Sequence, residues 1–215
     1  MRLAATGASP ASARLGLVMI HGRGADAADI LGLVAALGLP EIAAVAPEAP
    51  GRSWWPTSFL APAAQVEPRV ERGLAAIDAA IADLEAGGLS RDRIALGGFS
   101  QGACLALEYA ARRGGPFHAV FGLSGALVGT GDADGEALES LYGFAPKAFE
   151  YTPRLQGVPV YLGCHERDPH IPLARVRETE AVLAGLGAQV DAHVHPGAGH
   201  GLTEGDVAAL RRYLN

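Results

Sequence analysis

The sequence predicts an α/β fold, in which a mostly parallel central sheet is covered by helices on both faces. Short apolar runs alternate along the chain with longer segments whose apolar side chains recur at three- and four-residue spacing. Such alternation is typical of parallel strands that are connected by helices. A length of 215 residues with 49% hydrophobic side chains allows a sizeable core. We therefore expect a single domain that spans residues 1–215.

The apolar runs predict the strands of the sheet. We expect strands at residues 15–20, 42–46, 94–97, 119–123, 158–162 and 189–195. Residues 1–14 are small and polar, so a short edge strand there stays open. Val190, Ala192 and Val194 alternate with polar residues, as in a strand with one face near solvent.

Helices are expected between these strands and at the C-terminal end. We place them at about 27–37, 66–86, 101–112, 173–186 and from Thr203 onward. Asp26 or Asp29 can cap the first, and Thr203 with Asp206 three residues later can form a capping box for the last. The proline-rich loop 48–62 and a short insert at 126–157, after the strand that ends near Leu123, have no regular pattern.

The composition argues against several kinds of partner. A formal net charge of -6, with no run of basic residues, disfavours nucleic acid and anionic membranes. Cys104 and Cys164 are too few for a disulfide framework, and we expect reduced core residues. No apolar stretch is long enough for a secretion signal or a membrane span. We therefore expect a cytoplasmic protein without stable membrane insertion; homodimer formation stays open.

One stretch predicts a nucleophile. The apolar run at 94–97 leads into Gly98-Phe99-Ser100-Gln101-Gly102 and then into an Ala/Leu-rich helix. A strand, a tight turn carrying Ser100 and a helix are the context of a nucleophile elbow. The turn brings the flanking positions so close together that glycine is favoured at both. In a chain with 29 glycines, a glycine-rich turn with an incidental serine is the alternative.

Two further residues complete a pattern at the carboxyl ends of the strands, where ligands bind in parallel sheets. Asp168 follows the strand at 158–162, and His200 follows the last strand. The order Ser100, Asp168, His200 is that expected of an α/β-hydrolase triad. The imidazole would take the serine proton, and the carboxylate would fix the imidazole tautomer. Asp168 before a proline also fits a simple turn, and Glu166 is a rival for the acid.

The remaining site residues are assigned by role. Backbone N–H groups of Arg23 and Gln101 would form the oxyanion hole. Trp54 and Trp55, with Phe59, are either core residues or the wall of an acyl pocket. His193 and His195 could be a metal pair, but no third ligand joins them at clear spacing.

These motifs carry a resemblance to a known family. They are His21-Gly22-Arg23-Gly24, Gly98-Phe99-Ser100-Gln101-Gly102, Asp168-Pro169-His170-Ile171-Pro172 and Gly199-His200-Gly201. In this order and chain length they resemble the phospholipase/carboxylesterase family of α/β-hydrolases, small serine esterases related to acyl-protein thioesterases. The resemblance implies that Ser100, Asp168 and His200 form the triad, and that Arg23 and Gln101 supply the oxyanion hole. It also implies hydrolysis of small or medium acyl esters, or thioesters, without a cofactor. Acyl-protein thioesterase or lysophospholipase activity is the alternative, ahead of a metal-dependent hydrolase or a non-catalytic binding protein.

Two departures from the family pattern bear on the substrate. Arg23 stands where acyl-protein thioesterases usually have leucine, and the insert after Ser124-Gly125 is longer than expected. The Arg23 guanidinium either faces the pocket mouth and favours negatively charged substrates, or turns outward to pair with an acid. The insert at 126–157 is a candidate partial lid. Palmitoyl-protein substrates are therefore not the first expectation.

Overall fold

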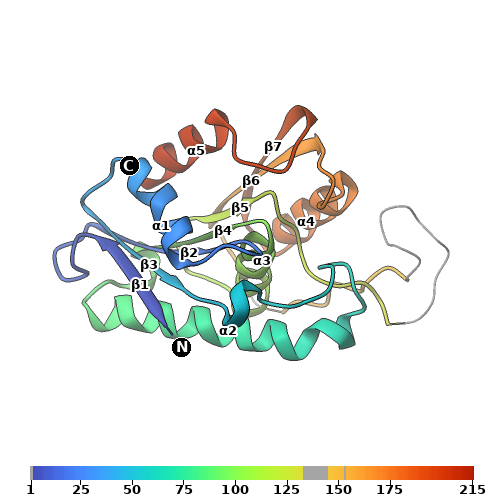
Figure 1. The fold of residues 1–215 in the computed structure, drawn as a ribbon, viewed down its shortest axis with the longest axis horizontal. Helices are drawn as coiled ribbons and strands as arrows, with labels where there is room; N and C mark the ends of the chain where they lie inside the picture. The colour runs from blue at the N-terminus through green and yellow to red at the C-terminus, as the bar shows by residue number, and fades with distance from the viewer. Residues whose placement is uncertain (1, 133–144, 153) are drawn as a thin grey trace.

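A computed structural model, which describes residues 2–132, 145–152 and 154–215, has three layers with the sheet in the middle (Figure 1). The described residues form a seven-stranded sheet of order β1-β3-β2-β4-β5-β6-β7. β1 pairs antiparallel with β3, and the other neighbours are parallel. The predicted α/β architecture is confirmed. The strands are β1 (Leu3–Gly7), β2 (Leu15–Ile20), β3 (Ile42–Pro47), β4 (Ile94–Phe99), β5 (Val120–Leu123), β6 (Pro159–Arg167) and β7 (Gln189–Ala198).

The observed strands differ from the predicted ones mainly at their ends. An edge strand does form at β1, where Leu3 pairs with Pro47, so β3 extends one residue beyond its predicted end. β6 and β7 run beyond the predicted ends and stay paired as far as His165 with His195 and Arg167 with Ala198. This polar extension of both strands carries the chain that follows them toward the site.

The strand order brings two loops together. β2 lies between β3 and β4, so the chain leaves β2 in one direction to form β3 and returns on the other side to form β4. After the neighbouring loops that follow β2 and β4, the chain continues to helices on opposite faces of the sheet, and such a switch point is where parallel sheets bind ligands. These loops carry Arg23 and Ser100 respectively.

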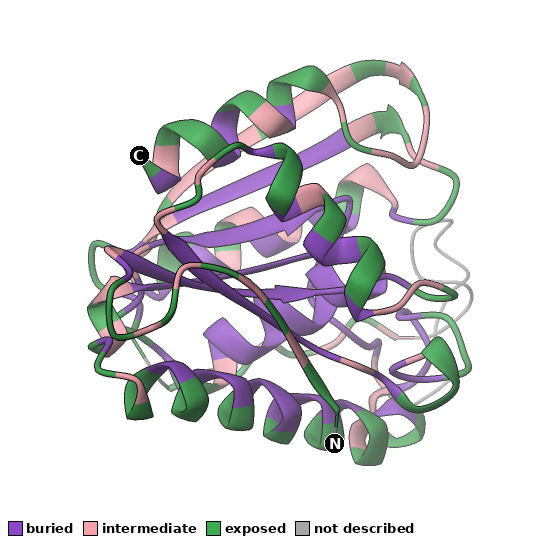
Figure 2. Ribbon diagram, turned by 60° about the vertical axis from the view of Figure 1, so that its left-hand side comes forward, coloured by how far each residue is buried: buried purple, intermediate pink, exposed green. Residues whose placement is uncertain are grey.

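Helices cover both faces of the sheet (Figure 1). The apolar faces of α2, α3 and α4 join one core cluster, and those of α1 and α5 join the other. Inner strands are buried throughout, whereas the outer face of α2 is exposed (Figure 2). The helices are α1 (Ala27–Ala36), α2 (Ala63–Ala86), α3 (Gln101–Arg113), α4 (Leu173–Gly185) and α5 (Glu204–Leu214), with short 3-10 helices η1 (Pro50–Arg52) and η2 (Arg91–Arg93).

Predicted helix caps are present at α1 and α5. Asp26 is the N-cap of α1 and forms a capping box with Asp29. Thr203 caps α5 with Asp206, whose carboxylate also accepts hydrogen bonds from Tyr161 and His195. Burial alone would raise the pKa of Asp206, but these hydrogen bonds outweigh it and the pKa is lowered. Asp206 therefore ties α5 to both β6 and β7.

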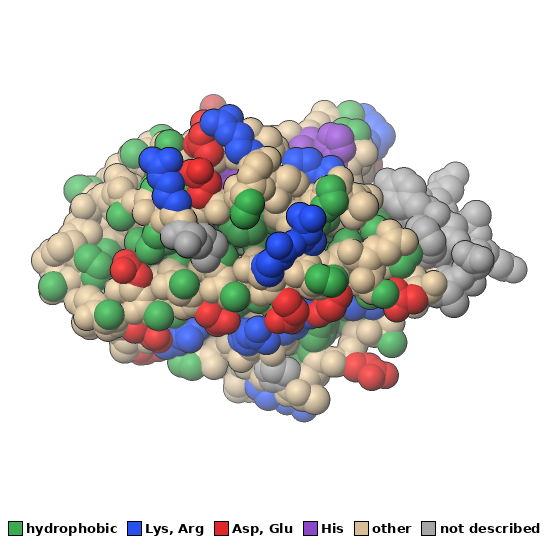
Figure 3. All heavy atoms as spheres, turned by 60° about the horizontal axis from the view of Figure 1, so that its bottom comes forward, with side chains coloured by type: hydrophobic (Ala, Val, Ile, Leu, Met, Phe, Trp, Pro, Cys, Tyr) green, Lys and Arg blue, Asp and Glu red, His purple; other side chains and the backbone are tan. Residues whose placement is uncertain are grey.

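The exposed face of α2 is charged. Acidic and basic side chains are interspersed along the side of the molecule shown in Figure 3. Arg112 of α3 forms ion pairs with Glu67 and Glu71 of α2, and with the buried Glu108 one turn earlier in its own helix. Among the helices that the structure describes, none combines the length and apolar character that a membrane span requires.

The expected insert at 126–157 is described only in part. Residues 126–132 and 145–152 pack beside α2 and α3; for example, Lys147 forms an ion pair with Glu108. The tip of the segment, on which the lid hypothesis depends, lies outside the described residues.

Candidate active site

Ser100 lies in a strained turn between β4 and α3. Its backbone φ of 55° and ψ of -120° belong to a region that side chains rarely adopt. A Cβ at Gly98 would come 2.4 Å from the backbone carbon of Gly102, and one at Gly102 would come 2.1 Å from the Ile20 carbonyl oxygen. Only glycine fits at these two places. The tight turn thus presents Ser100 at the end of the central strand, as a nucleophile elbow requires.

A chain of hydrogen bonds joins Ser100 to two residues from later strands. Ser100 Oγ lies 2.8 Å from His200 Nε2, and His200 Nδ1 lies 2.8 Å from Asp168 Oδ2. Asp168 follows β6, and His200 follows β7. An ionised carboxylate only accepts hydrogen bonds, so Nδ1–H donates to Asp168 and Nε2 is free to accept the serine proton. This arrangement can remove a proton from Ser100 as its oxygen attacks an acyl carbon.

Asp168 is held by its own loop. The carboxylate accepts backbone N–H bonds from His170 at 2.8 Å and Ile171 at 3.1 Å through the oxygen that does not contact His200. Burial alone would raise the pKa of Asp168, but the bonds from His200 and the two N–H groups outweigh it and the pKa is lowered. Asp168 therefore stays ionised at neutral pH. The rival acid, Glu166, instead contacts Arg167 and the Gly197 N–H.

The loop after β2 lies against Ser100. A Cβ at Gly22 would come 3.4 Å from the Ser100 Cβ. The buried His21 accepts a hydrogen bond from the Ala49 N–H at Nε2, so Nδ1 carries the proton that it donates to the Gly22 carbonyl, 2.8 Å away. That carbonyl and the Arg23 N–H belong to one planar trans peptide, and point in opposite directions. His21 thus orients the backbone donor predicted for the oxyanion hole.

The backbone N–H and the side chain of Gln101 have different roles at the site. It is the first residue of α3, so its backbone N–H has no acceptor within the helix. Its buried side chain accepts a hydrogen bond from the Trp54 N–H at 2.9 Å and donates one to the Trp55 carbonyl at 2.8 Å. The side chain therefore fastens the proline-rich loop to the elbow, a role that the sequence does not reveal.

The two tryptophans have different positions. Trp55 lines the cavity above Ser100. Trp54 is not among the lining residues; its ring packs 5.2 Å from that of His21, and its Nε1–H donates to the His21 carbonyl. The interpretation of Trp54 as a pocket wall is therefore wrong, because its indole supports the loop from within the core.

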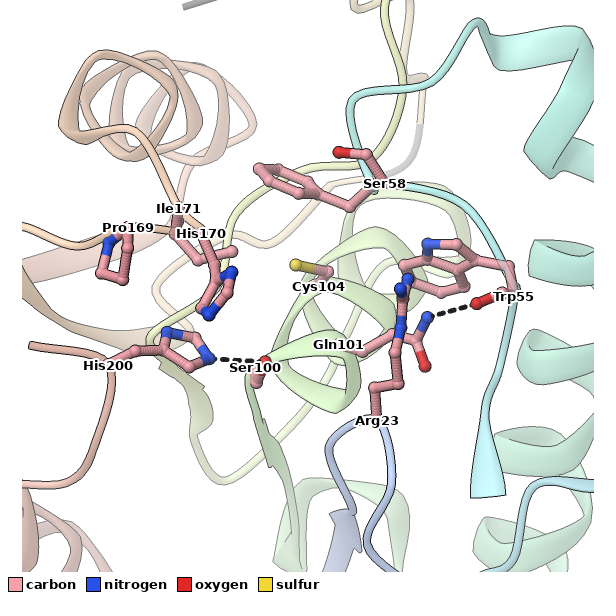
Figure 4. Close-up of a pocket in the computed structure, with 11 residues that line it drawn as sticks. Arg23, Trp55, Ser58, Ser100, Gln101, Cys104, Pro169, His170, Ile171 and His200 are labelled. Atoms are coloured by element: carbon pink, nitrogen blue, oxygen red, sulfur yellow. Dashed lines mark hydrogen bonds between the residues drawn. The ribbon is translucent and has the colours of Figure 1, made fainter. Parts of the chain in front are cut away.

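A cavity of about 450 Å³ opens beside Ser100 (Figure 4). Ligand pockets for small molecules are commonly of this size. Burial raises the pKa of the Cys104 thiol in its wall to about 12, so this sulfur is protonated and a poor nucleophile at neutral pH. The described lining residues are Arg23, Trp55, Ser58, Phe59, Ser100, Gln101, Cys104, Pro169, His170, Ile171 and His200.

Sequence reasoning did not identify His170 as a residue of the cavity. Its ring lies edge-on to that of His200, with 4.7 Å between the ring centres, and it lines the cavity. The available signal was its position two residues after Asp168, at the carboxyl end of a strand. The direction of its side chain depends on the Asp168 turn, which only the structure shows.

Arg23 is directed to the cavity rather than to an acid. Its guanidinium donates to the Thr57 carbonyl and lines the cavity wall. Asp26, the acid nearest in sequence, is paired with Arg52 at 2.6 Å. The alternative in which Arg23 turns outward to an acid is therefore wrong for the part of the chain that the structure describes.

The histidine pair of β7 has carboxylate partners. His193 lies 2.9 Å from Asp191, and His195 lies 3.0 Å from Asp206. Within residues 2–132, 145–152 and 154–215, no group of three or more His, Cys, Asp or Glu side chains could hold a metal ion.

Comparison with known proteins identifies the family. Residues 6–215 match the model of the phospholipase/carboxylesterase family. A phospholipase/carboxylesterase from Dyadobacter fermentans is 32% identical with a TM-score of 0.87, over 99% of this chain and 95% of that one. Esterase PE8 is 27% identical with a TM-score of 0.76, over 100% of this chain and 98% of that one. The fold is shared by a carboxylesterase from Mesorhizobium loti. It is 21% identical with a TM-score of 0.72, over 95% of this chain and 91% of that one.

No curated protein sequence matches this chain. The family match covers nearly its whole length, and the structural matches confirm the predicted α/β-hydrolase fold. The resemblance inferred from four short motifs is thus confirmed, and the chain belongs to the phospholipase/carboxylesterase family.

Proposed function

We propose that this protein is a serine carboxylesterase in which Ser100, His200 and Asp168 form the catalytic triad. Family membership and the similar esterases support hydrolase activity of the phospholipase/carboxylesterase type. The observation that carries the proposal is the pair of 2.8 Å hydrogen bonds that link the three side chains, with Ser100 at the strained turn facing the cavity.

Acylation begins when Ser100 Oγ attacks the ester carbonyl carbon and His200 Nε2 takes the serine proton. The imidazolium that forms is stabilised by the buried Asp168 carboxylate. When the tetrahedral intermediate collapses, the carbon–oxygen bond of the ester breaks and Nε2 gives its proton to the departing alkoxide. Water then attacks the acyl-serine by the same route, releases the carboxylic acid and restores Ser100.

The negative charge on the carbonyl oxygen is stabilised by backbone donors. We assign the N–H of Gln101, at the N-terminus of α3, and the N–H of Arg23, in the peptide that His21 orients. Each donor of this kind is worth about 3 kcal/mol in the transition state because it is already in place before charge develops. The helix dipole of α3 adds to the field at the same point.

The cavity favours small or medium acyl groups. Its volume of about 450 Å³ suits an acyl chain of modest length. Thioesters follow the same route with a thiolate as the leaving group, and acyl-protein thioesterase or lysophospholipase activity is the alternative.

Replacement of Ser100 tests the proposal. Ser100→Ala should lower kcat for p-nitrophenyl butyrate by about 10⁶-fold, because the triad acts as a unit, while the circular dichroism spectrum and Tm stay close to wild type. Ser58→Ala is the matched control: this serine also lines the cavity, but its hydroxyl accepts the Leu60 N–H and does not contact His200. A Ser100→Ala protein that keeps substantial turnover contradicts the proposal.

A further inference from the structure

One wall of the cavity carries a hydrogen-bond donor that no described residue satisfies. The Trp55 side chain lines the cavity and is fully buried, yet its Nε1–H has no acceptor among the described residues. Buried donors almost always have an acceptor, and a ligand in the cavity could supply this one once a small side-chain movement uncovers the Nε1–H, which exposes almost no surface. Trp54, next in the chain, has its indole donor satisfied by the His21 carbonyl, which makes the contrast specific to Trp55.

The same cavity holds an unneutralised positive charge. Arg23 uses one nitrogen to donate to the neutral Thr57 carbonyl, and its guanidinium keeps several further N–H donors. The described lining residues include no aspartate or glutamate. The whole chain has a formal net charge of -6, so the basic character of this wall is a local feature and not a consequence of overall composition.

We propose that Arg23 and Trp55 form a subsite for a carboxylate on the acyl group, so that the preferred substrates are monoesters or monothioesters of dicarboxylic acids. The guanidinium would bind the carboxylate as an ion pair, and the indole N–H would donate to the same group. Hydrolysis at the esterified carbonyl breaks the carbon–oxygen or carbon–sulfur bond, adds water and yields a dicarboxylate plus an alcohol or thiol. This proposal rests on the serine esterase function proposed above.

The geometry favours the acyl side of the substrate. His200 gives a proton to the leaving group, so the alcohol or thiol portion lies on its side of Ser100. In Figure 4 Arg23 and Trp55 lie on the opposite side of Ser100 from His200. A carboxylate held by Arg23 and Trp55 therefore belongs to the acyl portion, with the ester carbonyl over Ser100 and the leaving group beside His200 and His170.

The test compares isosteric esters. Mono-p-nitrophenyl esters of succinic, glutaric and adipic acids are measured beside the same compounds with the free carboxylate converted to a carboxamide, and the uncatalysed rate is subtracted. The wild-type enzyme should show a higher kcat/KM for the acid at one or more chain lengths. Arg23→Met should lower the acid-to-amide ratio by about tenfold, as expected for loss of a charge-assisted hydrogen bond. Trp55→Phe, which replaces the indole with a smaller aromatic ring that has no N–H, should lower it by a smaller factor.

Arg72→Met is the matched control. Arg72 is also exposed and also donates to a backbone carbonyl, that of Pro68, but it lies on α2 away from the cavity, so the ratio should not change. A wild-type ratio at or below one, or a ratio that does not move in either the Arg23 or the Trp55 variant, overturns the subsite while leaving the esterase function intact. Failure of wild type to hydrolyse any ester overturns both.

A second measurement needs no variant. The monoamide of adipic acid should inhibit wild-type hydrolysis of p-nitrophenyl butyrate with an inhibition constant about tenfold lower than that of the diamide, because only the monoamide has a carboxylate to place on Arg23 when its amide end lies at Ser100. Equal inhibition constants overturn the proposal even if the substituted proteins fail to fold.

Discussion

The Asp168 carboxylate provides a sharp test of the proposed triad, because it would fix the tautomer of His200. In Asp168→Asn the amide oxygen can still accept the N–H groups of His170 and Ile171, so the loop should keep its shape. The amide NH₂ then faces His200 Nδ1, which must accept a hydrogen bond and leave the ring proton on Nε2. A protonated Nε2 cannot take the proton of Ser100. This change of tautomer should lower kcat by about 10⁴-fold, or about 5 kcal/mol of transition-state stabilisation.

The assay is kcat for p-nitrophenyl butyrate together with the Tm of each protein. Glu166→Gln makes the same chemical change two residues earlier, at a carboxylate that contacts Arg167 and the Gly197 N–H, and should leave kcat near the wild-type value. An Asp168→Asn enzyme with nearly wild-type kcat, or a Glu166→Gln enzyme with the large loss, would refute the assignment of the acid.

Three further predictions concern the turn, the C-terminal network and the chemistry. Gly102→Ala should destabilise the protein by about 1–3 kcal/mol, because its Cβ would meet the Ile20 carbonyl, whereas Gly32→Ala, which has open space in α1, should raise the free energy of unfolding by about 0.5–1 kcal/mol in urea titrations. Asp206 has a lowered pKa in the folded protein, so its contribution to stability is present above the unfolded pKa of about 3.9 and is lost as the pH falls through the folded value. Asp206→Asn should therefore lower Tm at pH 7 and flatten the decline of Tm below about pH 4, and the exposed Asp83→Asn should do neither. Turnover should survive prolonged incubation with EDTA, because an imidazole activates the proposed nucleophile; a loss that zinc restores would favour a metal-dependent hydrolase instead.

The sequence was sufficient to predict the elements that depend on local pattern. Ser100 and Asp168 each follow an apolar run that predicts a buried strand, and His200 follows a strand predicted from alternating apolar residues, so their convergence at one edge of the sheet followed from parallel topology. Glycine at positions 98 and 102 was informative because backbone atoms approach there to within 2.1–2.4 Å of where a Cβ would lie. Such close contacts require glycine and can therefore be recognised in the sequence.

The direction of side chains in the loops was not predictable. Trp54 and Trp55 are adjacent in a proline-rich loop, and the hydrogen bonds between Gln101 and their backbone groups hold that loop at the elbow, so the sequence alone does not show which indole lines the cavity. Arg23 faces the cavity because the Thr57 carbonyl, 34 residues away in sequence, accepts its guanidinium. Contacts between distant loops of this kind leave no periodic signal.

The lengths of the last two strands were underestimated for a related reason. His165, Glu166 and Arg167 have no apolar pattern, yet they continue β6 because β7 pairs with them beyond the body of the sheet. Backbone hydrogen bonds between two strands can extend a ladder with little help from side chains.

The central claim is that Ser100 is the residue that becomes acylated. Incubation with a fluorophosphonate probe, followed by digestion and mass spectrometry of the labelled peptide, tests it directly because the probe bonds to an activated serine. The account predicts one label per chain, on Ser100, with labelling abolished in Ser100→Ala and retained in Ser58→Ala. Labelling that persists in the Ser100→Ala protein, or a label found on another residue of the wild type, would contradict it.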